Sequence, residues 1–74
     1  MKLRQMEERC GSLEQGIASL EGEIAGLEGE LSRFVSTGET MRLSKLLDQR
    51  RNELSARMGE WEKATAELEA VKAL

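Results

Sequence analysis

The chain contains no histidine, proline or tyrosine, and it has only one cysteine, one tryptophan and one phenylalanine among its 74 residues. Without histidine, catalysis by an imidazole and most zinc-binding residue sets are excluded. The single cysteine, Cys10, cannot form an internal disulfide. Leu, Glu, Ala, Lys and Arg dominate instead, and a third of the residues are charged, a composition typical of long helices and coiled coils.

Long apolar runs are also missing. The longest are pairs such as Leu46-Leu47, which predicts that no segment spans a membrane. The N-terminus is charged from Lys2 onward and has no apolar core of a signal peptide. We therefore expect a cytoplasmic protein. Its formal net charge of −3 gives no overall attraction to nucleic acid or anionic lipid.

What the sequence does contain is a strict apolar repeat. Three near-identical heptads run from Ser12 to Ser32, within the series Leu3, Met6, Cys10, Leu13, Ile17, Leu20, Ile24, Leu27, Leu31 and Phe34. The spacings of three and four residues average 3.5, as in the seam of a coiled coil, and they predict a helix over about 3–34. Several glycines lie off this seam. We interpret them as solvent-facing, with close approach of a second backbone at Gly16 as the alternative.

A turn and a second helix follow. The segment Val35 to Glu39 has turn composition, and Ser36 with Glu39 three residues later fits a capping box. The next apolar series is Leu43, Leu46, Leu47, Leu54, Met58, Trp61, Leu68 and Val71. The sequence thus predicts an all-α fold, an antiparallel two-helix coiled-coil hairpin with a turn at about 35–39 and a second helix over about 40–73. We expect residues 1–74 to form a single domain, which is either a small protein or a piece of a larger one.

The position of the turn also predicts which residues face each other. In an antiparallel hairpin the numbers of facing residues have a constant sum, and a turn near Thr37 sets this sum near 74. Six apolar layers result: Leu31–Leu43, Leu27–Leu47, Leu20–Leu54, Leu13–Trp61, Met6–Leu68 and Leu3–Val71. Three further layers are Cys10–Ala64, Ile24–Arg50 and Ile17–Arg57. Glu21 and Glu23 flank the arginine of one layer, so we expect them to pair with Arg50 or Arg51.

Catalytic, cofactor-binding and metal-binding sets are not apparent in the sequence. Cys10 occupies a seam position, and we interpret it as a small core residue rather than a nucleophile. The scattered glycines form no phosphate-binding loop. The glutamates at 14, 21, 23, 28 and 30 are interpreted as a solvated helix face rather than a cation site. We predict no enzyme activity and no cofactor in this chain.

The basic residues offer the one candidate for a binding site. Arg42, Lys45, Arg50, Arg51 and Arg57 lie on the second predicted helix. With two acids among them they give a local net charge of +3. Such a stretch can follow a phosphate backbone, and phosphate contacts dominate affinity for nucleic acid. The competing interpretation is that these cations balance the acidic stretch from Glu14 to Glu30 on the first helix.

Two segments resemble the C-terminal domain of ABC-F ATPases. These are LEGEIAGLEGEL (Leu20 to Leu31) and EWEKATAELEA (Glu60 to Ala70), with the leucines at 43, 46 and 47 between them. The family joins two ATP-binding cassettes without membrane domains. Many members end in an antiparallel two-helix coiled coil whose return helix carries a Trp-Glu pair, as Trp61-Glu62 does here. The resemblance covers about Leu13 to Leu74, although family tails are often more basic and have a longer turn.

The resemblance implies a fragment of an ATPase that binds ATP and Mg²⁺ in cassettes outside this chain. The coiled coil would be an accessory arm that contacts DNA or ribosomal RNA, with Arg42, Lys45, Arg50, Arg51 and Arg57 as candidate contacts. The alternative is a protein–protein interaction or dimerisation coiled coil without a nucleic-acid role. In a third possibility the hairpin does not close, and two chains associate in parallel through the first helix.

Overall fold

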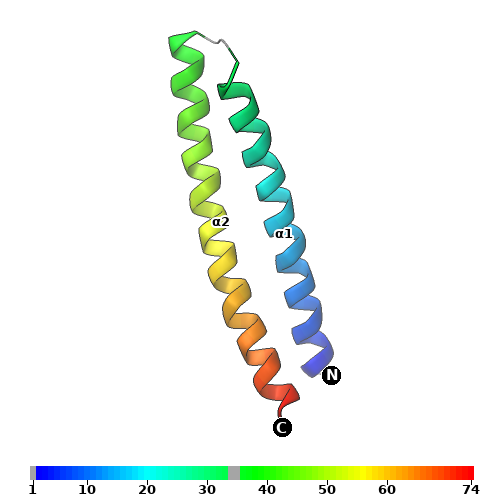
Figure 1. Cartoon of the computed structure of the whole chain (residues 1–74). Coiled ribbons are helices and arrows are strands. Elements are labelled where there is room, and N and C mark those ends of the chain that lie inside the picture. Colours follow the sequence, from blue (N-terminus) through cyan, green and yellow to red (C-terminus); the bar gives the residue numbers. More distant parts are fainter. Residues whose placement is uncertain (1, 34–35) are drawn as a thin grey trace.

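Two long helices make up the chain. The computed structural model describes residues 2–33 and 36–74. Helix α1 (Lys2–Leu31) and helix α2 (Thr37–Lys72) pack against each other in antiparallel orientation as a hairpin (Figure 1). The rod measures 56 × 15 × 14 Å, with both chain ends at one end and the connection between the helices at the other. The predicted all-α hairpin is confirmed, and the hairpin closes within one chain.

Helix α1 ends at Leu31, earlier than the predicted position 34. The Ser32 hydroxyl donates a hydrogen bond of 2.7 Å to the carbonyl oxygen of Gly29. The amide of Arg33 donates to the carbonyl of Glu30 at 3.2 Å, a bond across three residues that tightens the last turn. These local bonds satisfy carbonyls that a continuing helix would otherwise use. The predicted seam position Phe34 lies outside the described residues, as does Val35.

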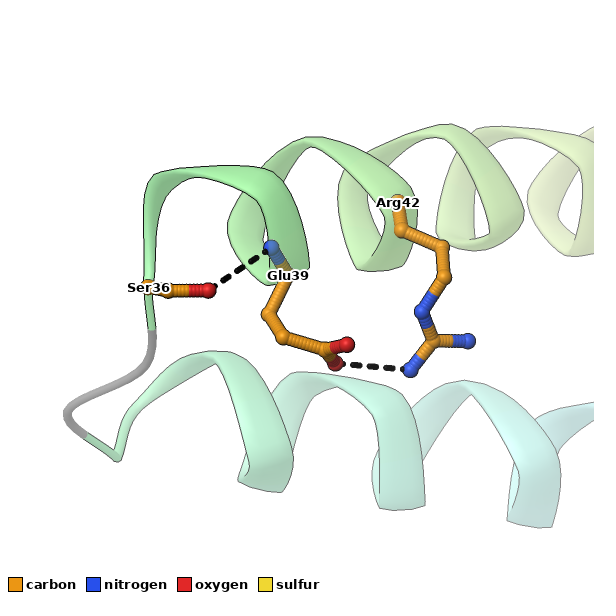
Figure 2. A network of polar contacts seen from close by, with 3 residues as sticks. All are labelled: Ser36, Glu39 and Arg42. Carbon is orange, nitrogen blue, oxygen red and sulfur yellow. Dashed lines mark hydrogen bonds and ion pairs between the residues drawn. The ribbon is translucent and has the colours of Figure 1, made fainter.

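Helix α2 begins at Thr37, so the predicted turn at 35–39 was too long. Ser36 caps the helix with extended backbone, and its hydroxyl accepts a hydrogen bond of 3.2 Å from the amide of Glu39 (Figure 2). This confirms the first half of the predicted capping box. The second half is replaced, because the Glu39 carboxylate turns to Arg42 instead of to the amide of Ser36. Thr37, Gly38 and Glu39 therefore form the first turn of α2.

The seam between the helices forms a narrow core. The buried side chains among the described residues are Cys10, Ile24, Leu43, Leu47, Ala64 and Leu68, all at predicted seam positions. Cys10 packs with Ala64 and Leu68, and Met6 and Leu13 lie against this cluster. This cluster agrees with the predicted layer Cys10–Ala64, and it places Met6 beside these residues. At the end of the rod that holds the termini, Leu3 is exposed.

The glycines face open space. A Cβ atom built at Gly16 would meet no atom within 4 Å apart from its own helical surroundings, and the same holds for the other glycines of α1. The alternative of a close backbone approach at Gly16 is therefore wrong. Neither described helix is long and apolar enough to cross a membrane.

Candidate nucleic-acid interface

The five candidate cations all lie on α2 but not on one face. Arg42 and Lys45 take outward positions of the heptad and are exposed. Arg50 and Arg57 sit at the seam positions that the register assigns to them, and Arg51 lies on a flank of the seam. Since one helical turn takes 3.6 residues, this stretch winds its charges around the helix instead of aligning them.

Arg50 is the most enclosed of the five and is held by two carboxylates. Its Nε atom lies 2.9 Å from an oxygen of Glu23 on α1, and a terminal nitrogen lies 2.9 Å from an oxygen of Glu53 on α2. The Arg50 side chain is 33% exposed, so its guanidinium lies at the edge of the seam. The predicted pair between Glu23 and Arg50 is confirmed. Arg50 thus links the two helices, and an external anion would have to compete with two carboxylates for it.

Arg51 and Arg57 also face carboxylates of this chain. Arg51 contacts Glu28 of α1 at 3.5 Å, rather than Glu21 or Glu23, which were the partners predicted for it or Arg50. Two helical turns separate Glu28 from Glu21. Side chains on a helix tilt toward its N-terminus, which for α2 is the end near Thr37, and Glu28 lies closer to that end than Glu21 or Glu23 does. Arg57 lies 3.0 Å from Glu60, three residues further along the same helix. Both pairs are solvent-exposed and of the kind that contributes about 0–1 kcal/mol.

Arg42 is paired within the first turns of α2. It donates a hydrogen bond of 2.8 Å to a carboxylate oxygen of Glu39 (Figure 2). This hydrogen bond, together with the positive charge of Arg42, lowers the pKa of the Glu39 carboxyl below its ordinary value. The same contact raises the pKa of the Arg42 guanidinium. Both side chains are freely accessible to solvent, so the pair can exchange for other ionic partners.

Lys45 differs from its four neighbours. Within residues 2–33 and 36–74, no carboxylate lies within 4.0 Å of its ammonium group. Lys45 and Arg42 stand three residues apart at exposed, outward heptad positions in the first turns of α2. Together with Arg57, whose partner Glu60 lies on the same helix, they are the candidate cations that an external anion can reach without opening a cross-helix contact. Arg42 and Lys45 are the two of these that lie close together.

Trp61 has a partner that the sequence interpretation did not identify. Its indole Nε1–H donates a hydrogen bond of 3.1 Å to a carboxylate oxygen of Glu14 on α1. Glu14 was interpreted as part of a solvated face. Glu14 directly follows Leu13, which the register places opposite Trp61. This position in the sequence could have indicated the contact with the indole. Glu14, Glu23 and Glu28 thus lie beside the seam on α1, and each binds a side chain of α2.

Over the described ranges, no three Cys, Asp or Glu side chains are grouped so that they could hold a metal ion. The polar groups form a series of ion pairs along and across the two helices. Such an arrangement can orient the helices and exchange contacts with a charged surface. No protein-family model, curated protein or solved structure matches this chain.

Proposed function

We propose that this chain is an accessory arm of an ABC-F-type ATPase, which contacts DNA or ribosomal RNA and carries out no catalysis itself. The observation that supports an arm is the shape of the hairpin. It is 56 Å long, and both chain ends lie opposite the turn (Figure 1). If a larger domain is attached at the chain ends, the turn end of the hairpin is the part of the rod that lies farthest from it. A narrow hairpin of this kind extends the reach of a larger protein.

The contact surface in this proposal is centred on Arg42 and Lys45. Both are exposed and lie in the first turns of α2, at the end of the rod where this helix begins. The ion pair of Arg42 with Glu39 is solvent-exposed, and exposed pairs are weak enough for a phosphate group to compete. Arg50 and Arg51 are held by carboxylates of α1, and Arg57 lies about three helical turns beyond Lys45, so these three contribute less. We therefore expect weak binding that is confined to low salt, because the chain as a whole is negatively charged.

Fluorescence anisotropy with labelled duplex DNA and with a labelled RNA hairpin tests this surface. The double variant Arg42→Gln/Lys45→Gln should bind several-fold more weakly at low salt. Loss of two phosphate contacts should also reduce the slope of log K against log salt by about 1.8 for duplex DNA. Lys63→Gln/Lys72→Gln is the matched control, since it removes the same charge from α2 outside this surface. Equal loss in both variants would indicate non-specific electrostatics, and no binding at low salt would contradict the nucleic-acid role.

The link to an ATPase has a separate test. The reading frame upstream of Met1 in the genome should encode two ATP-binding cassettes with phosphate-binding loops. An upstream frame without such cassettes would contradict the ABC-F assignment.

A second candidate function is contact with another protein, including a second copy of this chain. It is favoured by apolar side chains that the hairpin leaves at its surface, notably Met41 and Met58. Exposed apolar groups on a protein with so narrow a core can mark an interaction surface.

A further inference from the structure

One side of α2 carries a shallow groove that α1 does not fill. A hollow of about 590 Å³ is lined by Arg51, Leu54, Ser55, Met58, Gly59 and Glu62. A smaller hollow of about 240 Å³ continues it toward the C-terminus and is lined by Glu62, Thr65, Ala66 and Glu69. Both hollows are formed by α2 alone and share Glu62. Together they extend over about five turns of one helix.

The larger hollow combines exposed apolar surface with free space. The Met58 side chain is 43% exposed and lies between Ser55 and Glu62 along this side. A Cβ atom built at Gly59 would meet nothing within 4 Å. Methionine adapts its shape readily to a partner surface, and glycine leaves space for a large side chain to approach the helix closely. The groove thus offers both an apolar group that can insert into a partner and a hole that can receive one.

The sequence of this side is complementary to itself in the antiparallel direction. If α2 of a second copy lies antiparallel with its centre between residues 56 and 57, each residue faces the residue at the mirrored position. The facing pairs are then Arg51–Glu62, Leu54–Gly59, Ser55–Met58, Asp48–Thr65 and Ser44–Glu69. The cation faces an acid, the two large apolar side chains face the two small residues, and no like charges meet. Each pair occurs twice, as the two-fold symmetry of a dimer requires.

We propose that a second copy of this chain occupies the groove and forms a two-fold symmetric dimer through antiparallel α2 helices. The proposal specifies the protein-contact function and does not depend on the nucleic-acid role. Arg51 can keep its contact with Glu28 while it reaches Glu62 of the other copy, because a guanidinium offers five donors.

A second groove, between the two helices, fits a second copy less well. It is lined by Glu23, Gly26, Leu27, Glu30, Leu46 and Arg50. Its one cation, Arg50, is already held by Glu23 and Glu53. The α2 groove therefore has the better charge complementarity.

The dimer is expected to be weak. The contact runs along a single helix from each copy, so it falls at the small end of protein interfaces, where association is transient. A dissociation constant on the order of 0.1–1 mM corresponds to such a contact. Sedimentation velocity over a concentration series should show a shift from monomer to dimer in this range.

Charge reversal across the groove is the decisive experiment. Arg51→Glu alone and Glu62→Arg alone each replace two attractive contacts by two like-charge contacts. Each should raise the dissociation constant of its homodimer at least about tenfold. An equimolar mixture of the two variants restores both attractive contacts between unlike chains. It should therefore associate as tightly as the unmodified chain, and the double variant Arg51→Glu/Glu62→Arg should do the same.

Lys63→Glu is the matched control, because it makes the same charge change as Arg51→Glu at an exposed position of α2 outside the groove lining. It should leave the dimer unchanged. Circular dichroism establishes that each variant keeps its helices. A chain that stays monomeric up to about 1 mM would overturn the proposal. So would a dimer that neither single variant weakens, or a mixture that does not recover association.

Discussion

The seam of the hairpin predicts a large difference between two apolar side chains that are only two residues apart. Leu43 is 2% exposed in the seam, whereas Met41 is 69% exposed on the outside of the same helix. Burying a leucine side chain contributes about 1.5–3 kcal/mol, and Leu→Ala changes in protein cores cost about 2–5 kcal/mol. The narrow seam can partly collapse around a truncated side chain. We therefore expect Leu43→Ala to cost about 2–3 kcal/mol, at the lower end of this range.

This loss is large compared with the total stability. A chain of this length is expected to have a free energy of unfolding of about 4–11 kcal/mol. The Tm of Leu43→Ala should therefore fall by about 10–20 °C in thermal melts followed by circular dichroism at 222 nm. Met41→Ala should stay within about 0.5 kcal/mol of the unmodified chain. Equal Tm values for the two variants would refute the assignment of Leu43 to the core.

Two further predictions concern the register and the cap of α2. Ala64→Cys should form an intrachain disulfide with Cys10 on mild oxidation, because the two positions share one buried cluster. Ala66→Cys on the exposed side should not, and a non-reducing gel that shows only crosslinked dimers for Ala64→Cys would refute the register. Arg42→Gln should raise the pKa of Glu39 toward its ordinary value in an NMR titration of its carboxyl carbon, since Arg42 donates the hydrogen bond that lowers it. The contribution of this ion pair to stability is present above the pKa of Glu39 in the unfolded chain, and it is lost as the pH falls through the lowered pKa in the folded chain. An unchanged pKa of Glu39 in the Arg42→Gln variant would contradict the pairing.

The register of the hairpin could be predicted because two independent features of the sequence agree. The strict spacing from Leu3 to Leu31 defines one face of a helix, and the turn near Ser36 places a second apolar series opposite that face. The resulting alignment brings Cys10 together with Ala64, and the structure has both residues in one buried cluster.

The ends of the helices were harder to predict because they depend on competition between hydrogen bonds. The apolar series continues past Leu31, but the Ser32 hydroxyl takes the carbonyl of Gly29 and α1 stops there. At the start of α2, Gly38 suggested a turn. The cap formed by Ser36 nevertheless brings it into the first helical turn. Each helix end depends on single hydrogen bonds that contribute about 0.5–1.5 kcal/mol. Composition and periodicity do not predict where differences in free energy of this size will end a helix.

At the candidate site, too, the sequence pattern predicted the positions of the charged residues but not which of them form ion pairs across the helices. The sequence identified the five cations on α2 and the acids on α1, and the spacing of Arg42 from Glu39 and of Arg57 from Glu60 fits pairing along one helix. Which acid each cross-helix arginine meets was left open. Side-chain length and direction decided that Glu23 receives Arg50 and Glu28 receives Arg51.

The sequence by itself determined the two helices, their antiparallel pairing and the positions of the seam, because apolar spacing and turn position are properties of the chain alone. Only the tertiary structure decided which polar groups remain available. It placed Glu14 on the indole of Trp61 and enclosed Arg50 between two carboxylates. It also left the groove around Met58 uncovered. The physical reason is that burial and ionic contact depend on the distance between side chains of different helices, and that distance exists only once the helices have packed.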